Sequence, residues 1–310
     1  MHLPFKLEDT GRNRLPWSHI TVAGFLVVGA FFSISQIGWI SREVLPSTEI
    51  IGILGWLTLF FTTICFSKNH ILPSAFVFFI FLGLGLWIGA YFEPPSDPTH
   101  HLFRTYQYYL DSYAFSIQKK VNFGFWHYSM NGIFLSLVEK TGDPDKILGI
   151  LNLLNGAYWG LLGVSVYLVS KAARLPDKWA FLSCIVCLCF FGTNKFSFFR
   201  YYSYGPTFTN MIMLMLWVRG FFFADDLKKI VLGGICAILL LPVLYVNHIQ
   251  ESAFLSIIVS VWLTALIIDK SISKRYATPS ILCTIFLLLF VLPQFGVLRE
   301  ILEKIFHRTK

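Results

Sequence analysis

The hydrophobic positions of this chain fall into long, nearly uninterrupted runs separated by short polar segments. Runs of about 18–23 apolar residues are long enough, at about 1.5 Å per residue, to cross a hydrocarbon core of about 30 Å. Backbone polar groups in lipid must be satisfied within the segment, and the runs lack the alternation of β-strands. We therefore predict an all-α polytopic membrane protein. Its expected transmembrane helices, about nine, cover 19–40, 49–67, 72–92, 150–170, 178–193, 205–223, 229–247, 252–268 and 279–297.

One hydrophilic segment, 93–149, is much longer than the others and is predicted to be an extracytoplasmic loop of a single membrane domain spanning 1–310. From Asp97 onward, ionisable and polar side chains recur at helical spacing, with aromatic residues on the opposite stripe. This pattern predicts an amphipathic helix lying in the membrane interface. A second amphipathic piece is expected at about 126–140, and Thr141-Gly142-Asp143-Pro144 is then expected to make a turn that leads into the fourth spanning segment.

The composition agrees with this class, because 55% of the residues are hydrophobic and only 14% are charged. With the N-terminus in the cytoplasm, the inside segments hold 13 Lys and Arg residues and the short outside loops hold three. The positive-inside rule therefore favours this orientation, in an inner (plasma) membrane of bacterial type. The net charge of +8 is explained by this topology, so no nucleic-acid partner is expected.

Cysteines and glycines lie inside the apolar runs. The six cysteines, Cys184-x-x-Cys187-x-Cys189 among them, have no histidine nearby in these runs, so we interpret them as buried thiols and expect no disulfide framework. The motif Gly83-x-Gly85-x-x-x-Gly89 follows no strand, so it predicts close helix packing instead of a nucleotide-binding loop.

Asp97 opens the long loop and stands close to His100 and His101. An aspartate with two nearby histidines could hold a divalent cation such as Mg²⁺ or Mn²⁺, or the carboxylate could accept a proton from a hydroxyl. Asp97-Pro98 is also a common start of a helix, and Asp97 could act only as its N-cap. We predict a catalytic or metal-binding role for Asp97, with His100 and His101 as further ligands.

His248-x-x-Glu251 forms a second cluster, which the predicted topology places on the same side of the membrane as Asp97. Residues at i and i+3 project together from a helix, so one imidazole and one carboxylate could share a ligand. The alternative is a polar turn that merely separates two helices. We predict Glu251 as a catalytic residue and His248 as a possible metal ligand.

Arg200 and Tyr204 belong to a third polar cluster on that side, where a guanidinium among tyrosines suits a lipid-linked phosphate. An aromatic interface belt with an extended arginine is the competing interpretation, and Arg104 could bind the phosphate instead. Trp126 and His127 could line an acceptor site, or sit as aromatic side chains in the interface. The predicted topology places these polar clusters on one side of the membrane, and we therefore predict that they form a single active site.

The architecture and the segment Ser96-Asp97-Pro98-Thr99-His100-His101-Leu102-Phe103-Arg104 resemble the GT-C superfamily of integral-membrane glycosyltransferases. The resemblance covers roughly 72–260. It implies a polyprenyl-phosphate-linked sugar donor, transfer on the external face, Asp97 as catalytic base or metal ligand, and a basic residue such as Arg200 at the donor phosphate.

The sequence therefore predicts a membrane glycosyltransferase that transfers a sugar from a polyprenyl-phosphate carrier to a lipid or glycan acceptor. Two alternatives from other classes stay open: a transporter or flippase of a lipid-linked glycan intermediate, and a non-catalytic subunit of a glycan assembly complex. A flippase would need ionisable groups or broken helices near mid-membrane, whereas the charges here cluster at helix ends.

Overall fold

The computed structural model describes residues 17–36, 48–91, 105, 124–139, 143–187, 206–224 and 227–268. Within these residues the ordered elements are helices, as the sequence predicts. They are α1 (Trp17–Gln36), α2 (Thr48–Ser67), α3 (Ile71–Tyr91), α6 (Phe125–Glu139), α7 (Pro144–Ala172), α8 (Asp177–Ile185), α10 (Pro206–Trp217), the π-helical turn η3 (Val218–Phe222), α11 (Leu227–Asn247) and α12 (Ile249–Ile268).

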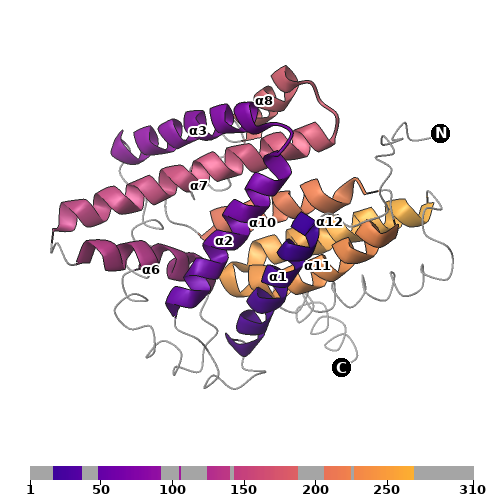
Figure 1. The fold of residues 1–310 in the computed structure, drawn as a ribbon, viewed down its shortest axis with the longest axis horizontal. Helices are drawn as coiled ribbons and strands as arrows, with labels where there is room; N and C mark the ends of the chain where they lie inside the picture. Colours follow the sequence, from indigo (N-terminus) through magenta and orange to yellow (C-terminus); the bar gives the residue numbers. More distant parts are fainter. Residues whose placement is uncertain are drawn as a thin grey trace, which may run out of the picture.

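The helices pack in two neighbouring groups (Figure 1). The long helix α7 lies along α3, with α8 folded back at one end, while α11 packs against both α1 and α12. Helices α2, α6 and α10 connect the groups, because each of them contacts α7 in one group and either α1 or α11 in the other. Many large apolar side chains stay exposed on the outside, including Leu72 (82% exposed) and Ile64 (66%). Exposed apolar side chains of this kind suit contact with lipid.

The nine predicted spans are not supported. Among the described residues, three helical segments are long and apolar enough to cross a membrane: Ile50–Ser67, Gly149–Ala172 and Lys228–Asn247. Of the expected span 178–193, the structure describes the nine-residue helix α8 and two more residues, and the rest lies outside the described residues. The expected span 205–223 is helical, but α10 gives way after 12 residues to the π-helical turn η3. Shorter apolar helices cover Val22–Ile34, Ile71–Trp87 and Glu251–Leu266, and the expected span 279–297 lies outside the described residues.

Helix α6 occupies nearly the expected range, but it does not lie on the surface. Its first seven residues, from Phe125 to Asn131, are all buried, and the helix packs against α2, α7 and α11. The pattern that suggested an interfacial helix therefore arises from inward polar groups that find partners inside the protein. The predicted first interfacial helix, from Asp97 onward, lies outside the described residues except for Thr105.

The start of α7 follows directly from its sequence. Asp143 is the N-cap, its carboxylate accepts a hydrogen bond from the backbone N–H of Asp145 (3.1 Å), and Pro144 occupies the first helical turn. Proline is favoured there because its missing N–H would have no intrahelical partner. The helix therefore begins at Pro144, six residues before the predicted fourth span, and the first half of the predicted turn lies outside the described residues.

The basic residues of the described helices lie mostly at one end of the bundle. Of the eight Lys and Arg residues described, all but Lys146 lie at the end where α2, α7 and η3 finish and α11 begins; they are Lys68, Lys171, Arg174, Lys178, Arg219, Lys228 and Lys229. We call this the basic end. In the predicted orientation this end faces the cytoplasm, and that orientation stays a prediction. The α11–α12 junction lies at the other end, which we call the junction end.

Close packing of α3 on α7 depends on small residues. A Cβ atom at Gly85 would lie 3.0 Å from Trp159 Cβ and 3.1 Å from the Cα of Gly156, whereas a Cβ at Gly83 would meet nothing within 4 Å. The predicted role in helix packing therefore holds for Gly85. It fails for Gly83, which faces outward.

We expect Gly85→Val to destabilise the protein by about 1–3 kcal/mol, because overpacking forces the two helix backbones apart. Gly83→Val is the matched control, since it adds the same β-branched residue two positions away into open space. Unfolding in mixed micelles would compare the two. Equal losses for both variants would contradict the packing role of Gly85.

Candidate functional site

The most polar region of the described interior lies at the α11–α12 junction. Helix α11 ends at Asn247, His248 interrupts the helix, and α12 begins at Ile249. The backbone N–H of Gly124 lies 2.8 Å from the carbonyl oxygen of Asn247 and 3.1 Å from that of Val246. Gly124 has a φ of +84°, which favours glycine. The beginning of α6 thus caps the end of α11, where helical carbonyls lack partners.

Asn247 joins three helices at this point. Its side-chain amide donates to the carbonyl oxygen of Pro206 (3.1 Å) and to Asn210 Oδ1 (2.8 Å). Its own Oδ1 accepts the backbone N–H of His127 at 3.1 Å. The side chain is fully buried, so these hydrogen bonds replace water that the amide would otherwise need. Asn247 therefore ties α6 and α10 to the end of α11.

Asn210 extends the network to the carboxylate. Its Nδ2 atom lies 3.0 Å from the carbonyl oxygens of both Leu244 and His248, and 3.3 Å from Glu251 Oε2. The first two contacts satisfy carbonyls at the helix break, and the third gives Glu251 Oε2 a hydrogen-bond donor.

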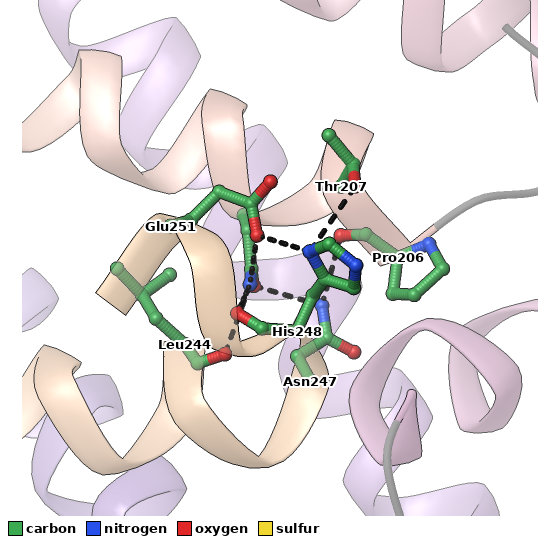
Figure 2. Close-up of polar contacts among 7 residues, drawn as sticks. Pro206, Thr207, Leu244, Asn247, His248 and Glu251 are labelled. Carbon is green, nitrogen blue, oxygen red and sulfur yellow. Dashed lines mark hydrogen bonds and ion pairs between the residues drawn. The ribbon is translucent and has the colours of Figure 1, made fainter. Parts of the chain in front are cut away.

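The His248 and Glu251 side chains lie in direct contact, as Figure 2 shows. Nδ1 of His248 is 2.6 Å from Glu251 Oε2, and 3.3 Å from the hydroxyl of Thr207. Glu251 is 1% exposed as a residue, whereas the His248 side chain is 25% exposed. The structure thus holds a buried carboxylate against a partly accessible imidazole, and it confirms that the two predicted residues project together.

The contact with Glu251 determines which nitrogen of the His248 ring can accept a proton from a substrate. With Nδ1–H donating to the carboxylate, Nε2 is the nitrogen that accepts a proton in the neutral ring. The carboxylate stabilises the imidazolium that forms and holds the ring in one orientation. A carboxylate–imidazole pair of this kind can act as a general base on a hydroxyl group.

His127 forms a second, deeper part of the network. Its Nδ1 lies 3.1 Å from the Thr209 hydroxyl, and its Nε2 lies 3.1 Å from Nδ2 of Asn131. The Tyr158 hydroxyl donates to Asn131 Oδ1 at 2.9 Å. With Nδ2 of Asn131 facing the ring, the contact at Nε2 suits a ring nitrogen that accepts, and Nδ1 can then donate to the Thr209 hydroxyl.

The two predicted acceptor-site residues on α6 are therefore placed inside the protein. His127 is fully buried, and Trp126, 2% exposed, donates from its indole N–H to Ser33 Oγ at 3.1 Å. Because both side chains are buried, they are neither part of an aromatic belt at the membrane interface nor exposed on an open acceptor surface. Their hydrogen bonds connect α6 to other helices. Contact of Trp126 or His127 with a substrate stays a prediction.

The other predicted site residues lie outside the described residues: Asp97, His100, His101, Arg104, Arg200 and Tyr204. Among the residues that the structure describes, no three His, Cys, Asp or Glu side chains gather as a metal site. Of the proposed cation ligands, His248 is the one described, and its Nδ1 is engaged by Glu251. The four described cysteines, Cys65, Cys184, Cys187 and Cys236, are free thiols.

Sequence reasoning missed the residues that hold the pair in place. Thr207, Asn210 and Asn247 come from two helices, and their partners lie more than 30 positions away in the chain. One signal was available: asparagines inside apolar runs are costly unless they are paired. Comparison of the chain with protein-family models, with curated proteins and with solved structures found no match.

Proposed function

We propose that this chain is a membrane-embedded glycosyltransferase that transfers a sugar from a polyprenyl-phosphate-linked donor to a hydroxyl group of a lipid or glycan acceptor. The observation that carries the proposal is the contact of 2.6 Å between buried Glu251 and partly accessible His248 at the junction end. The donor class rests on the resemblance of residues 96–104 to the GT-C superfamily.

The proposed reaction needs one base and a good leaving group. The acceptor oxygen attacks the anomeric carbon of the donor sugar, its proton passes to His248 Nε2, and the new glycosidic C–O bond forms. The anomeric C–O bond to the phosphate breaks at the same time, and its electron pair leaves with the polyprenyl phosphate. His248 is the catalytic residue in this step, and Glu251 acts through it as a positioning residue.

The remaining predicted residues have roles on the donor side. Arg104 or Arg200 would neutralise the phosphate by bidentate hydrogen bonds. Asp97 would hold the divalent cation or assist as a second base, as the resemblance implies. A bound Mg²⁺ or Mn²⁺ would stabilise the departing phosphate charge.

Transport of a lipid-linked glycan is supported less well. A carrier commonly places ionisable groups at mid-membrane, on broken helices. In the described part of the chain, the carboxylate–imidazole pair lies where α11 ends and α12 begins, beside the first residues of α6 and α10. A base at a membrane interface suits a reaction at that surface.

A transfer assay tests the proposal. The protein in lipid nanodiscs would be given polyprenyl-phosphate-linked hexoses with extracted membrane glycolipids, and release of polyprenyl phosphate would be followed by mass spectrometry. We expect release that depends on acceptor, and loss of one glycolipid or glycan from cells that lack the protein. Unchanged glycolipids in those cells, with no release from any donor, would contradict the proposal.

A further inference from the structure

The first turn of α10 supplies two polar side chains to the proposed active site. Thr207 Oγ1 lies 3.3 Å from His248 Nδ1 (Figure 2), and Asn210 Nδ2 lies 3.3 Å from Glu251 Oε2. Both contacts would be lost if α10 rotated about its axis, because hydrogen bonds weaken steeply with distance and angle. The contacts that fix the rotation of this turn therefore also fix the surroundings of the carboxylate–imidazole pair.

A third polar side chain of the same turn faces a different helix. Thr209 is fully buried, and its Oγ1 lies 3.1 Å from Nδ1 of His127 on α6. Successive residues of a helix are rotated by about 100°, so Thr209 and Asn210 hold α10 from two directions. Towards α7 the contact is apolar, with 5.8 Å between the ring centroids of Phe208 and Trp159. An apolar contact is not directional and tolerates a small rotation, whereas a hydrogen bond does not.

The His127 ring is a firmly held partner for Thr209. It is fully buried, and its Nε2 lies 3.1 Å from Nδ2 of Asn131, one turn further along α6. The Tyr158 hydroxyl donates to Asn131 Oδ1 and also hydrogen-bonds Thr209, so α6, α7 and α10 share one closed set of hydrogen bonds. The backbone N–H of His127 reaches Asn247 at the end of α11. His127 therefore connects the first turn of α10 to the helix end that precedes the pair.

We propose that His127 is a positioning residue of the proposed active site, an inference that rests on the proposed function. Its Nδ1 contact with Thr209 fixes the rotation of α10, and α10 in turn keeps its two polar side chains against the pair. The two ring nitrogens therefore have different consequences. The Nδ1 contact acts on α10 and hence on the site, whereas the Nε2 contact stays within α6. This role needs no contact between His127 and a substrate.

Two amide substitutions distinguish the two ring nitrogens. The amide of His127→Asn reaches the place of Nδ1, so it can still donate to Thr209. The longer amide of His127→Gln reaches the place of Nε2, so it can still accept from Asn131 but leaves Thr209. Each variant loses one of the two buried hydrogen bonds of the ring, and the two should therefore unfold alike. Each variant is thus the matched control for the other.

The two variants should differ in the rate of sugar transfer. We expect kcat in the nanodisc assay to fall less than about threefold in His127→Asn and about tenfold or more in His127→Gln, with KM unchanged, because displacement of a reacting group by about 1 Å can cost about 100-fold. Equal kcat in two variants of equal stability, or a change in KM alone, would overturn the positioning role.

Thr209→Val tests the route through α10. The valine keeps the shape of the side chain but removes the hydroxyl that His127 contacts. In this background His127→Asn and His127→Gln should be equally slow, because the contact that distinguishes them is absent. A difference that persists between them would show that His127 acts by another route. Thr209→Ser, which keeps the hydroxyl, should retain the wild-type rate.

Chemical labelling of His248 gives a measurement that does not need sugar transfer. Its side chain is 25% exposed whereas His127 is buried, so diethyl pyrocarbonate should modify His248, and mass spectrometry of the labelled peptide gives the rate. We expect the wild type and His127→Asn to react at one rate. His127→Gln should react faster, because Thr207 and Asn210 no longer cover the ring.

The labelling also distinguishes a wrong positioning role from a wrong function. If the variants label as expected but no protein transfers sugar, the proposed function fails and the positioning of the pair by His127 stands. Equal labelling rates in all three proteins overturn the positioning role, whatever the rates of transfer. If neither variant of His127 folds, Thr209→Val against Thr209→Ser decides by the same labelling, with faster reaction expected for the valine alone and equal rates contradicting the role.

Discussion

Glu251→Gln is expected to lower the rate of sugar transfer by about 100-fold or more, the usual contribution of a general base. The glutamine keeps the shape of the side chain and still reaches His248 and Asn210, but it cannot stabilise a protonated imidazole. The protein should therefore remain folded, with its unfolding transition close to that of the wild type. The measurement is the turnover number in the nanodisc assay.

The double variant distinguishes catalysis from packing. If Glu251 acts through His248, then His248→Ala and His248→Ala/Glu251→Gln should be equally slow, because the carboxylate has no imidazole left to assist. Ser252→Ala is a control at the next buried position of α12 and should retain most activity. Losses that simply multiply in the double variant would show that Glu251 has a role of its own.

Asn247→Leu should be the most destabilising single substitution at the junction. It leaves the His127 N–H, the Pro206 carbonyl and Asn210 Oδ1 without the partners they have in the native structure. Each unsatisfied buried group costs about 1–3 kcal/mol, so we expect a loss of roughly 3 kcal/mol or more in the free energy of unfolding. Unfolding in mixed micelles would measure it.

Asn155→Leu provides the matched control. Asn155 is also fully buried, but neither of its amide atoms has a hydrogen-bond partner among the residues that the structure describes. The same substitution there removes an uncompensated polar group, so stability should stay the same or rise. Equal losses at the two asparagines would mean that the network around Asn247 contributes little to stability.

Local features of the fold were predictable from the sequence, because they depend on neighbouring residues. The apolar runs identify helices, and the i, i+3 spacing brings His248 and Glu251 together. The N-cap Asp143 was expected only as part of a turn before the fourth span, although α7 already begins at Pro144. The count of spanning segments was less predictable. A run such as 205–223 counts as apolar, yet its backbone changes to a π-helical turn at Val218–Phe222.

The environment of the pair was not predictable, because it depends on contacts between distant segments. The backbone of His127 reaches Asn247 across 120 positions, and Trp126 reaches Ser33 across 93. No local pattern encodes which helix faces which, so α6 was expected at the membrane interface. Polar residues such as Asn131 and Asn210 indicate from the sequence that a buried amide needs a hydrogen-bond partner, but not which residue provides it.

Rescue of a variant that lacks the ring is the most direct test of the proposed base. His248→Ala in nanodiscs should transfer sugar about 100-fold more slowly than the wild type, and imidazole added to the buffer should restore part of the lost rate, because the free base can accept the proton of the acceptor hydroxyl in place of the missing ring. The same imidazole should not speed up the wild-type protein. Transfer by His248→Ala at the wild-type rate, or a loss that imidazole leaves unchanged, would contradict a base formed by His248 and Glu251.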